Sequence, residues 1–208
     1  MRVTMDAVHP DASPARSDAL TGLPGRDAAR ARLADWLERG EPVHGLLIGL
    51  RRFDAVNLAY GNAAGDAALA EVAARIRHFA HSELEGAWIA ARGGGGQFLL
   101  MTTEPCSRER WQMVSAQLLD RLALPITVGG NTLRLSPRGA LLRSLGGEEV
   151  DSLLDRLGQT LASLMAAQGK RVFIPRGQVA NAEHAHQRFE LVCQRHREGG
   201  RVARQGIA

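Results

Sequence analysis

Four consecutive glycines, residues 93–96, separate two apolar runs in the stretch ARGGGGQFLL. Glycine adopts left-handed backbone conformations without steric cost, so such a run can form a sharp turn or let the backbone approach a ligand closely. Successive backbone N–H groups in a turn of this kind can also form a nest that binds phosphate. The alternative, which we favour, is a permissive hairpin turn without a chemical role.

The segments around the glycines predict an α/β fold. The flanking runs GAWIAAR and QFLLM predict the two strands of an antiparallel hairpin. Residues 43–50 form a continuous apolar run, which is typical of a central strand buried on both faces. Helices are expected at 27–40, 52–60, 67–80, 107–124 and 148–168, and further strands at 132–144 and 171–175. This order predicts helices flanking one central mixed sheet.

Composition indicates one domain with short extensions, because the chain has 208 residues and is 45% hydrophobic. We divide it into a flexible arm (1–17), a domain (18–176) and a basic C-terminal extension (177–208) that is helical in part. A net charge of +4 does not argue for nucleic acid, and no basic stripe is interleaved with aromatic residues. Neither a signal peptide nor a membrane segment is expected. Cys106 and Cys193 have no metal-binding or disulfide spacing, and a cytoplasmic protein is expected.

Three blocks of the sequence, in a fixed order, carry a family resemblance. They are DALTGLPGR (18–26), LLIGLRRFDAVNLAYGNAAGD (46–66) and ARGGGGQF (91–98). Together they resemble the entry motif, the second block and the signature hairpin of GGDEF domains, the diguanylate cyclases of bacterial signalling. The resemblance covers 18–175 and implies the nucleotidyl cyclase-like fold, with a central sheet. It also implies an ancestral reaction in which two GTP-loaded domains face each other and form cyclic di-GMP and pyrophosphate.

The resemblance further implies where Mg²⁺ would bind, namely at acids on the end of the buried strand and in the hairpin. Mg²⁺ prefers hard carboxylate oxygens. In this chain the first acidic position of the strand is Gly49 and the second is Arg51. A glycine offers no ligand, so we expect no metal at Gly49 and no cofactor. Mg²⁺ and GTP are expected only if the chain retains cyclase activity.

The signature hairpin also departs from the family pattern. Gly94 and Gly95 match its two glycines and Phe98 matches its phenylalanine. Gly96 stands in place of the aspartate, and Gln97 in place of the glutamate. A glutamine oxygen is a neutral, weak ligand for Mg²⁺. We therefore predict that these positions are degenerate and that no catalytic residue remains.

Positions that the resemblance assigns to the nucleotide are partly retained. Asn57 and Asp66 stand where the family reads the guanine base, whose donors and acceptor they could satisfy. The structural alternative, which we favour, is that Asp66 caps a helix and Asn57 orders the neighbouring turn. Among the phosphate positions, Asp54 and Ala166 replace lysines, whereas Lys170 keeps the charge of an arginine.

Two further features concern partners. The family's product-binding Arg-x-x-Asp motif corresponds to EGAW (85–88), which lacks both residues. Arg51, Arg52 and Arg92 are expected to approach the mouth of the site. There they could hold an acidic partner segment or a nucleotide, or could simply be solvated.

The leading hypothesis is a catalytically inactive GGDEF domain that acts as a binding or scaffold module in cyclic di-GMP signalling. Its expected partner is another protein or a second copy of the chain, with a guanine nucleotide as a further ligand. The alternative is a residual diguanylate cyclase that converts two GTP to cyclic di-GMP. Nucleic-acid binding, based on the arginine excess and the basic tail, ranks last.

Overall fold

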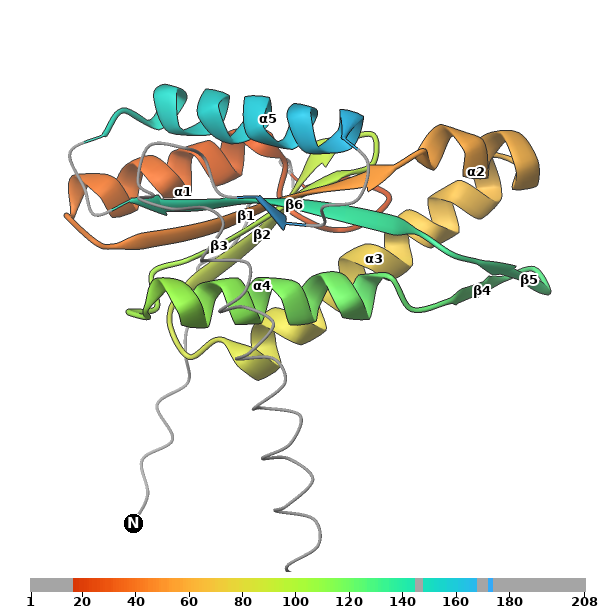
Figure 1. Ribbon diagram of the computed structural model, residues 1–208, viewed down its shortest axis with the longest axis horizontal. Coiled ribbons are helices and arrows are strands. Elements are labelled where there is room, and N and C mark those ends of the chain that lie inside the picture. Colours follow the sequence, from red (N-terminus) through yellow and green to blue (C-terminus); the bar gives the residue numbers. More distant parts are fainter. Residues whose placement is uncertain (1–16, 145–147, 168–171, 174–208) are drawn as a thin grey trace, which may run out of the picture.

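A computed structural model describes residues 17–144, 148–167 and 172–173. They form a five-stranded sheet in the order β2-β3-β1-β6-β7, with helices on both of its faces (Figure 1). The helices are α1 (Arg26–Glu38), α2 (Phe53–Tyr60), α3 (Asn62–Glu83), α4 (Arg108–Leu122) and α5 (Val150–Ala166). The strands are β1 (Val43–Arg51), β2 (Trp88–Gly94), β3 (Gln97–Thr102), β4 (Ile126–Val128), β5 (Asn131–Leu133), β6 (Ser136–Ser144) and β7 (Val172–Phe173). β7 is parallel to β6 and the other pairs are antiparallel, which confirms the predicted mixed sheet.

Strand β1 lies at the centre of the sheet, as its uninterrupted apolar run predicts. It pairs with β3 on one side and with β6 on the other, and its residues are buried apart from Leu47 and Arg51, which are half-buried. Successive side chains of a strand point to opposite faces, so β1 contributes to two separate cores. Leu46 and Ile48 belong to the core beneath α3 and α4, and Val43 belongs to the core beneath α1 and α5.

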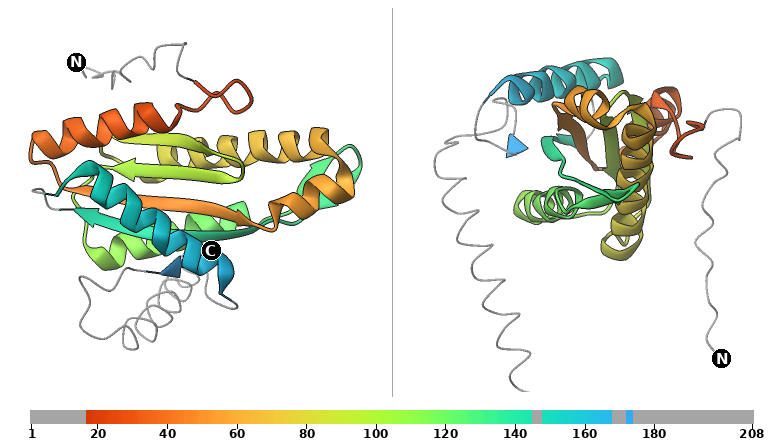
Figure 2. Two further views of the ribbon diagram at one scale, coloured as in Figure 1. Left: turned by 90° about the horizontal axis from the view of Figure 1, so that it is seen from above. Right: turned by 90° about the vertical axis from the view of Figure 1, so that its right-hand side faces the viewer.

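The helices cover the two faces in pairs. Figure 1 shows α1 and α5 on one side of the sheet and α3 and α4 on the other, and the view from above in Figure 2 shows α1 and α5 over the strands. Apolar residues recur at helical spacing in the sequences of α3 and α4, which predicts one buried face on each helix. This is confirmed by the burial of these residues, namely Leu69, Val72, Ala73, Ile76, Phe79, Trp111, Val114, Leu118 and Leu122. Gly40 has a φ of 68° just beyond α1, which confirms that the first helix stops there.

Two element boundaries differ from the predictions. Helix α3 begins at Asn62 rather than at Ala67, because Gly61, with a φ of 83°, is the only residue between α2 and α3. The segment 132–144 is not one strand, since its first residues belong to β5 and pair with β4 in a separate hairpin. Strands of three residues are too short for hydrophobic periodicity to identify them.

Several predictions lie outside the described residues. These are the arm up to residue 16, Lys170, Cys193 and the extension 177–208. Within the described part of the chain, no helix combines the length and apolar character needed to cross a membrane.

The packing of α4 on the sheet leaves too little room for a methyl group at one position unless a neighbouring side chain shifts. A Cβ atom on Gly139 of β6 would lie 2.7 Å from Leu46 Cδ1 and 3.0 Å from Leu119 Cδ1. These leucines come from β1 and α4, so Gly139 lets the helix approach two strands closely. By contrast, a Cβ on Gly158, within α5, would meet nothing within 4 Å.

The same substitution at these two glycines should therefore act in opposite directions. We expect Gly139→Ala to lower the free energy of unfolding by about 1–3 kcal/mol through overpacking. Gly158→Ala should raise it by about 0.5–1 kcal/mol, because alanine favours the helix. Denaturant titration of both variants tests this, and equal effects of the two substitutions would contradict the described packing.

Candidate functional site

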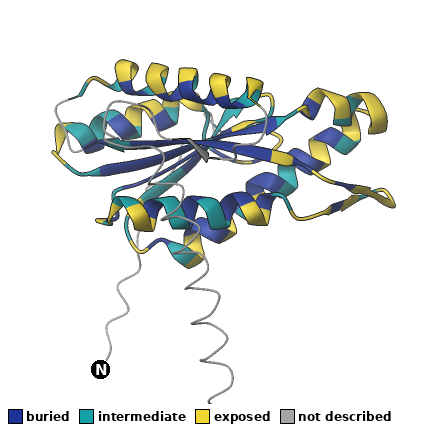
Figure 3. Ribbon diagram, viewed as in Figure 1, coloured by how far each residue is buried: buried dark blue, intermediate teal, exposed yellow. Residues whose placement is uncertain are grey.

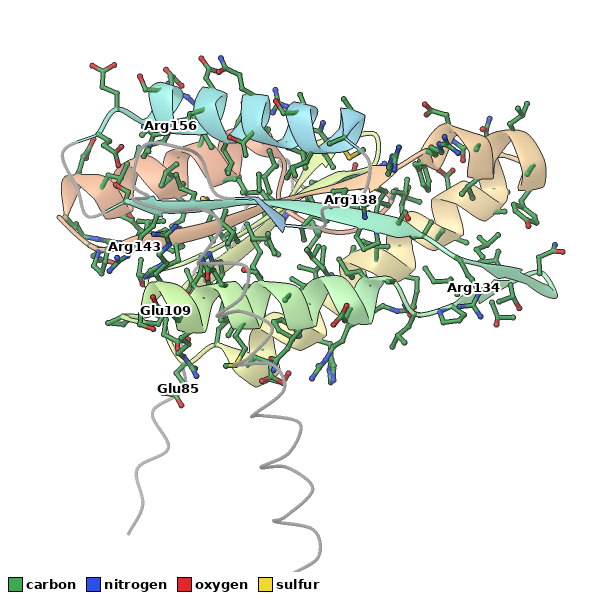
Figure 4. The ribbon with its side chains drawn as sticks, viewed as in Figure 1. Glu85, Glu109, Arg134, Arg138, Arg143 and Arg156 are labelled. Atoms are coloured by element: carbon green, nitrogen blue, oxygen red, sulfur yellow. The ribbon has the colours of Figure 1, made fainter. Side chains whose placement is uncertain are left out.

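The candidate site lies where β1 ends beside the β2–β3 hairpin. Gly49 of β1 pairs with Gln97 of β3 and with Arg138 of β6. Directly opposed residues point to the same face, so these three positions form a row across the sheet on the side of α1 and α5. Arg138 is buried, with 8% of its surface exposed, whereas Gln97 is exposed. Figure 4 labels Arg138 on β6, below the C-terminal part of α5.

The space directly above Gly49 is filled by helix α5. A Cβ atom at this position would lie 3.0 Å from Met165 Sδ and 3.2 Å from Leu161 Cδ2. Both contacts are closer than most Cβ atoms tolerate, and both neighbours are apolar. A carboxylate at position 49 would therefore project into a thioether and a leucine side chain, which cannot solvate its charge.

The glycine turn folds back onto the end of β1. Gly94 and Gly95 have φ angles of 98° and 53°, which glycine adopts readily. The carbonyl of Gly96 accepts a hydrogen bond of 3.0 Å from the backbone N–H of Leu50. A Cβ at Gly96 would lie 3.2 Å from Leu50 Cβ and 3.4 Å from Phe53 Cβ. The turn is thus held by the backbone and by close packing, and the phosphate nest remains a prediction.

Arg92 is engaged within the chain. Its Nη1 donates to Asp18 Oδ1 at 2.9 Å, and its Nη2 donates to the Gly95 carbonyl at 3.2 Å. Its backbone N–H donates to the Pro24 carbonyl at 2.8 Å. The expectation that Arg92 is available to a partner is therefore wrong, because this side chain joins the N-terminal turn to the hairpin.

The Asp18 carboxylate is stabilised by this arrangement. Oδ1 also accepts hydrogen bonds from the Thr21 backbone N–H at 2.8 Å and the Thr21 hydroxyl at 2.7 Å. Burial alone raises the pKa of Asp18, but the hydrogen bonds from Thr21 and Arg92 outweigh burial and hold the pKa below its usual range.

Arg51 and Arg52 differ from Arg92 in having no such partner. Among the described residues, neither makes an ion pair or a side-chain hydrogen bond. Arg52 is exposed and has a φ of 56°, the one positive φ of a non-glycine residue in the part that the structure describes. This left-handed conformation turns the chain from β1 into α2, and non-glycine residues adopt it at some energetic cost.

Asn57 and Asp66 lie on two neighbouring helices. The Oδ1 atom of Asn57 is buried without a hydrogen-bond partner, and a Cβ at Gly65 would collide with it. Asp66 is exposed and lies inside α3, whose N-cap is Gly61. The alternative that Asp66 caps this helix is therefore wrong, because α3 begins four residues before it.

A second group of titratable side chains, at the other end of β1, was not identified from the sequence. His44 is 1% exposed, and its ring centroid lies 5.7 Å from that of Trp111. Burial and then Arg143 lower the pKa of His44, while Glu104 opposes them. Burial raises the pKa of the nearby Cys106 thiol. No three His, Cys, Asp or Glu side chains in the described ranges are grouped to hold a metal, so we assign no metal site to this group.

The sheet order and the site at the end of β1 define an α/β domain of the nucleotidyl cyclase type. The family described as "Diguanylate cyclase, GGDEF domain" matches residues 15–171. The chain therefore belongs to the GGDEF family.

Two curated relatives illustrate the sequence similarity. The chain is 30% identical over 152 residues to the cyclic di-GMP phosphodiesterase NbdA of Pseudomonas aeruginosa. The aligned region covers 71% of this chain and 19% of NbdA. It is 32% identical over 160 residues to the uncharacterized protein Rv1354c of Mycobacterium tuberculosis. This alignment covers 76% of this chain and 25% of Rv1354c. The chain thus spans a quarter or less of the length of these relatives.

Solved structures agree with this fold. The diguanylate cyclase SiaD of Pseudomonas aeruginosa, in complex with its activator SiaC, has a TM-score of 0.69 at 24% identity, covering 78% of this chain and 62% of SiaD. At that identity the likeness establishes the fold alone. The GGDEF domain of PA1120 (TpbB or YfiN) from the same species has a TM-score of 0.61 at 27% identity, covering 75% of this chain and 93% of that domain.

The Asp18–Arg92 contact should make stability depend on pH. Because the pKa of Asp18 is lower in the folded state, its stabilisation is present above the pKa of an unfolded aspartate, about 4, and is lost as pH falls through and below that value. We expect Asp18→Asn to lower the free energy of unfolding by about 1–2 kcal/mol at pH 7, and by less near about pH 3.

Denaturant titrations of both proteins at the two pH values test this expectation. The control is Asp151→Asn, which removes an exposed carboxylate bound to Arg30 at 2.7 Å and should change stability little because solvent screens that pair. A pH-independent effect of Asp18→Asn would contradict the assigned role of its charge.

Proposed function

We propose that this GGDEF domain is catalytically inactive and acts as a binding or scaffold module in bacterial cyclic di-GMP signalling. The packing at Gly49 carries the proposal. Nucleotidyl transfer depends on stabilising negative charge, which Mg²⁺ held by carboxylates usually supplies. Here Met165 Sδ lies 3.0 Å from where the first atom of a side chain at 49 would be, so apolar atoms take the place of a metal ligand.

The remaining residues at the site support the same conclusion. Gly96 has no side chain, and Gln97 offers only a neutral amide oxygen. Arg138 brings a positive charge to the strand next to Gly49, where it would repel a divalent cation. The described residues therefore do not fit Mg²⁺, and we derive no catalytic step through it.

The similar proteins support a place in cyclic di-GMP signalling. They include the phosphodiesterases NbdA and PdeR, the latter from Escherichia coli at 32% identity over 117 residues. SiaD, whose fold is similar, is a diguanylate cyclase that forms a complex with an activator protein. By analogy, we propose that this chain has a protein partner or associates with itself.

A guanine nucleotide is a second candidate ligand, favoured by the state of Asn57 and Asp66. Asn57 retains a buried Oδ1 without a partner in the described part of the chain, and the Asp66 carboxylate is exposed beside it on α3. Since α3 does not need Asp66 as its cap, the carboxylate is available to base N–H groups. Lys170, the third residue expected here, lies outside the described residues.

Incubation with GTP tests the proposal directly. We expect the purified chain to form no cyclic di-GMP with Mg²⁺ or Mn²⁺, under conditions in which SiaD forms it. Formation of cyclic di-GMP would overturn the proposal in favour of a residual diguanylate cyclase. Calorimetric titration with GTP, with and without Mg²⁺, tests the second candidate. Binding that needs no Mg²⁺ and that Asp66→Asn abolishes would support it, with Asp155→Asn on α5 as the control.

The packing argument can be tested separately at Gly49. We expect Gly49→Ala to lower the free energy of unfolding by about 1–3 kcal/mol, and Gly49→Asp to lower it further because a carboxylate is buried as well. Adding Met165→Ala should recover part of the loss, which a double-mutant cycle measures as a coupling energy. If Gly49→Asp were neutral and gained stability from Mg²⁺, the site would retain room for a metal.

A further inference from the structure

Two directly opposed residues, His44 on β1 and Arg143 on β6, each bury a nitrogen atom without a hydrogen-bond partner. The atoms are His44 Nδ1 and Arg143 Nε, and neither has a partner among the described residues. His44 is 1% exposed and Arg143 is half-buried, and Figure 3 shows the central strands buried along most of their length. Side chains of directly opposed residues point to the same face, with Cβ atoms about 5 Å apart. Because buried polar atoms normally have partners, this pair requires an explanation.

The start of α4 lies over the same end of the strands. The ring centroid of Trp111, in the first turn of α4, lies 5.7 Å from that of His44, and its Nε1 donates to the Gly45 carbonyl at 3.1 Å. Figure 4 labels Arg143 on β6, near the start of α4. Ser107 is the N-cap of this helix, which has 15 residues. A helix N-terminus carries a partial positive charge and N–H groups that its own backbone does not use, so it adds to the attraction for an anion.

The acid beside this group is already engaged. Glu104 Oε1 accepts a hydrogen bond from Arg110 Nη2 at 2.9 Å, and its Oε2 accepts one from the backbone N–H of Glu85 at 3.0 Å. Burial raises the pKa of the Cys106 thiol, so at neutral pH this group adds no negative charge. Arg143 forms no ion pair with a described residue. Within the described part of the chain, its positive charge is therefore not matched by a paired carboxylate.

We propose that His44 and Arg143 bind a phosphate group at the N-terminus of α4. Phosphate oxygens accept hydrogen bonds from a guanidinium, from an imidazole N–H and from the start of a helix, which are the three donors that meet here. A divalent cation fits less well, because Arg143 would repel it. A free phosphate ion and the phosphate of a small phosphorylated metabolite offer the same chemistry.

This site is separate from the one described above. It lies at the opposite end of β1 from Gly49 and uses none of the positions that the family assigns to the nucleotide. It also includes no residue of the stretch 85–88, which corresponds to the family's product-binding motif. The inference therefore goes beyond the proposed function and does not depend on it.

Calorimetric titration of the full chain with inorganic phosphate, in a phosphate-free buffer without Mg²⁺, tests the site. We expect saturable binding at a single site. Arg143→Gln should raise the dissociation constant about tenfold or more, because it removes a charge-assisted hydrogen bond. The matched control is Arg134→Gln, which removes an exposed arginine that Figure 4 labels at the opposite end of the molecule, and it should leave binding unchanged. A parallel titration with ribose 5-phosphate separates the two sources, since only a site for a phosphorylated metabolite has room for the sugar.

Nuclear magnetic resonance of His44 gives an independent readout. The charged and titratable groups around His44 are Arg143 on β6, Glu104 and Cys106 after β3, and Arg110 on α4. Burial and then Arg143 lower the pKa of His44. Bound phosphate should raise this pKa, because a neighbouring anion favours the imidazolium. His44→Phe keeps an aromatic ring against Trp111 but removes the N–H donor, so it should weaken phosphate binding several-fold, with folding verified by circular dichroism.

Three results would overturn the proposal. One is the absence of saturable phosphate binding, and another is equal weakening by Arg143→Gln and Arg134→Gln, which would indicate attraction by net charge alone. The third is a pKa of His44 that phosphate leaves unchanged. The proposed function fails on a different observation, the formation of cyclic di-GMP, so the two failures are distinguishable.

Discussion

Burial of β1 on both faces is the constraint on which the rest of the structure depends. A central strand must satisfy its backbone hydrogen bonds with neighbours on both sides, and β3 and β6 supply them in register with β1. The side chains of β1 alternate between the α3–α4 core and the α1–α5 core. Helices can approach closely only where the strands carry small residues. Gly139 lies beneath α4 and Gly49 beneath α5, and a Cβ atom at these positions would come within 2.7 and 3.0 Å of a side-chain atom, respectively.

The position of β1 also determines which residues lie together at the end of the sheet. Once β1 and β3 are in register, Gln97 lies beside Gly49, and the glycine turn closes over Leu50 and Phe53. Arg92 then fixes the hairpin to the N-terminal turn through Asp18. These contacts lie within the chain and together fix the shape of the hairpin. Met165 occupies the space above Gly49, since a Cβ atom there would lie 3.0 Å from its Sδ.

The surface beside the end of β1 differs from this packed interior, because it carries unpaired charges and exposed apolar residues. Arg51 and Arg52, together with Asp54 and Asp66, carry charges that no described side chain neutralises. Next to them the uncharged stretch 55–65 exposes Leu58 to solvent. The interior of the site is thus filled by its own chain, while the adjoining exterior offers both apolar area and charge. This combination is one basis of the proposed recognition of another macromolecule.

The sequence by itself determined the local elements and the family. A continuous apolar run identified β1, two apolar runs around the glycines identified the hairpin, and helical spacing identified the buried faces of α3 and α4, because each signal lies within one segment. The three motifs identified the GGDEF family, which the match over 15–171 confirms. The resemblance also predicted which positions of the site lack a carboxylate, a prediction that needs only the residue types at the matched motif positions.

Only the tertiary structure decided what surrounds those positions. That Met165 fills the space above Gly49, that Arg92 is bound to Asp18, and that His44 lies against Trp111 all follow from contacts between distant segments. The early start of α3 and the β4–β5 hairpin also escaped prediction. In the first case Gly61 alone breaks the helices, and in the second the strands are too short to show a period. Local patterns encode which face of an element is apolar, whereas strand register and helix packing decide which residue meets it.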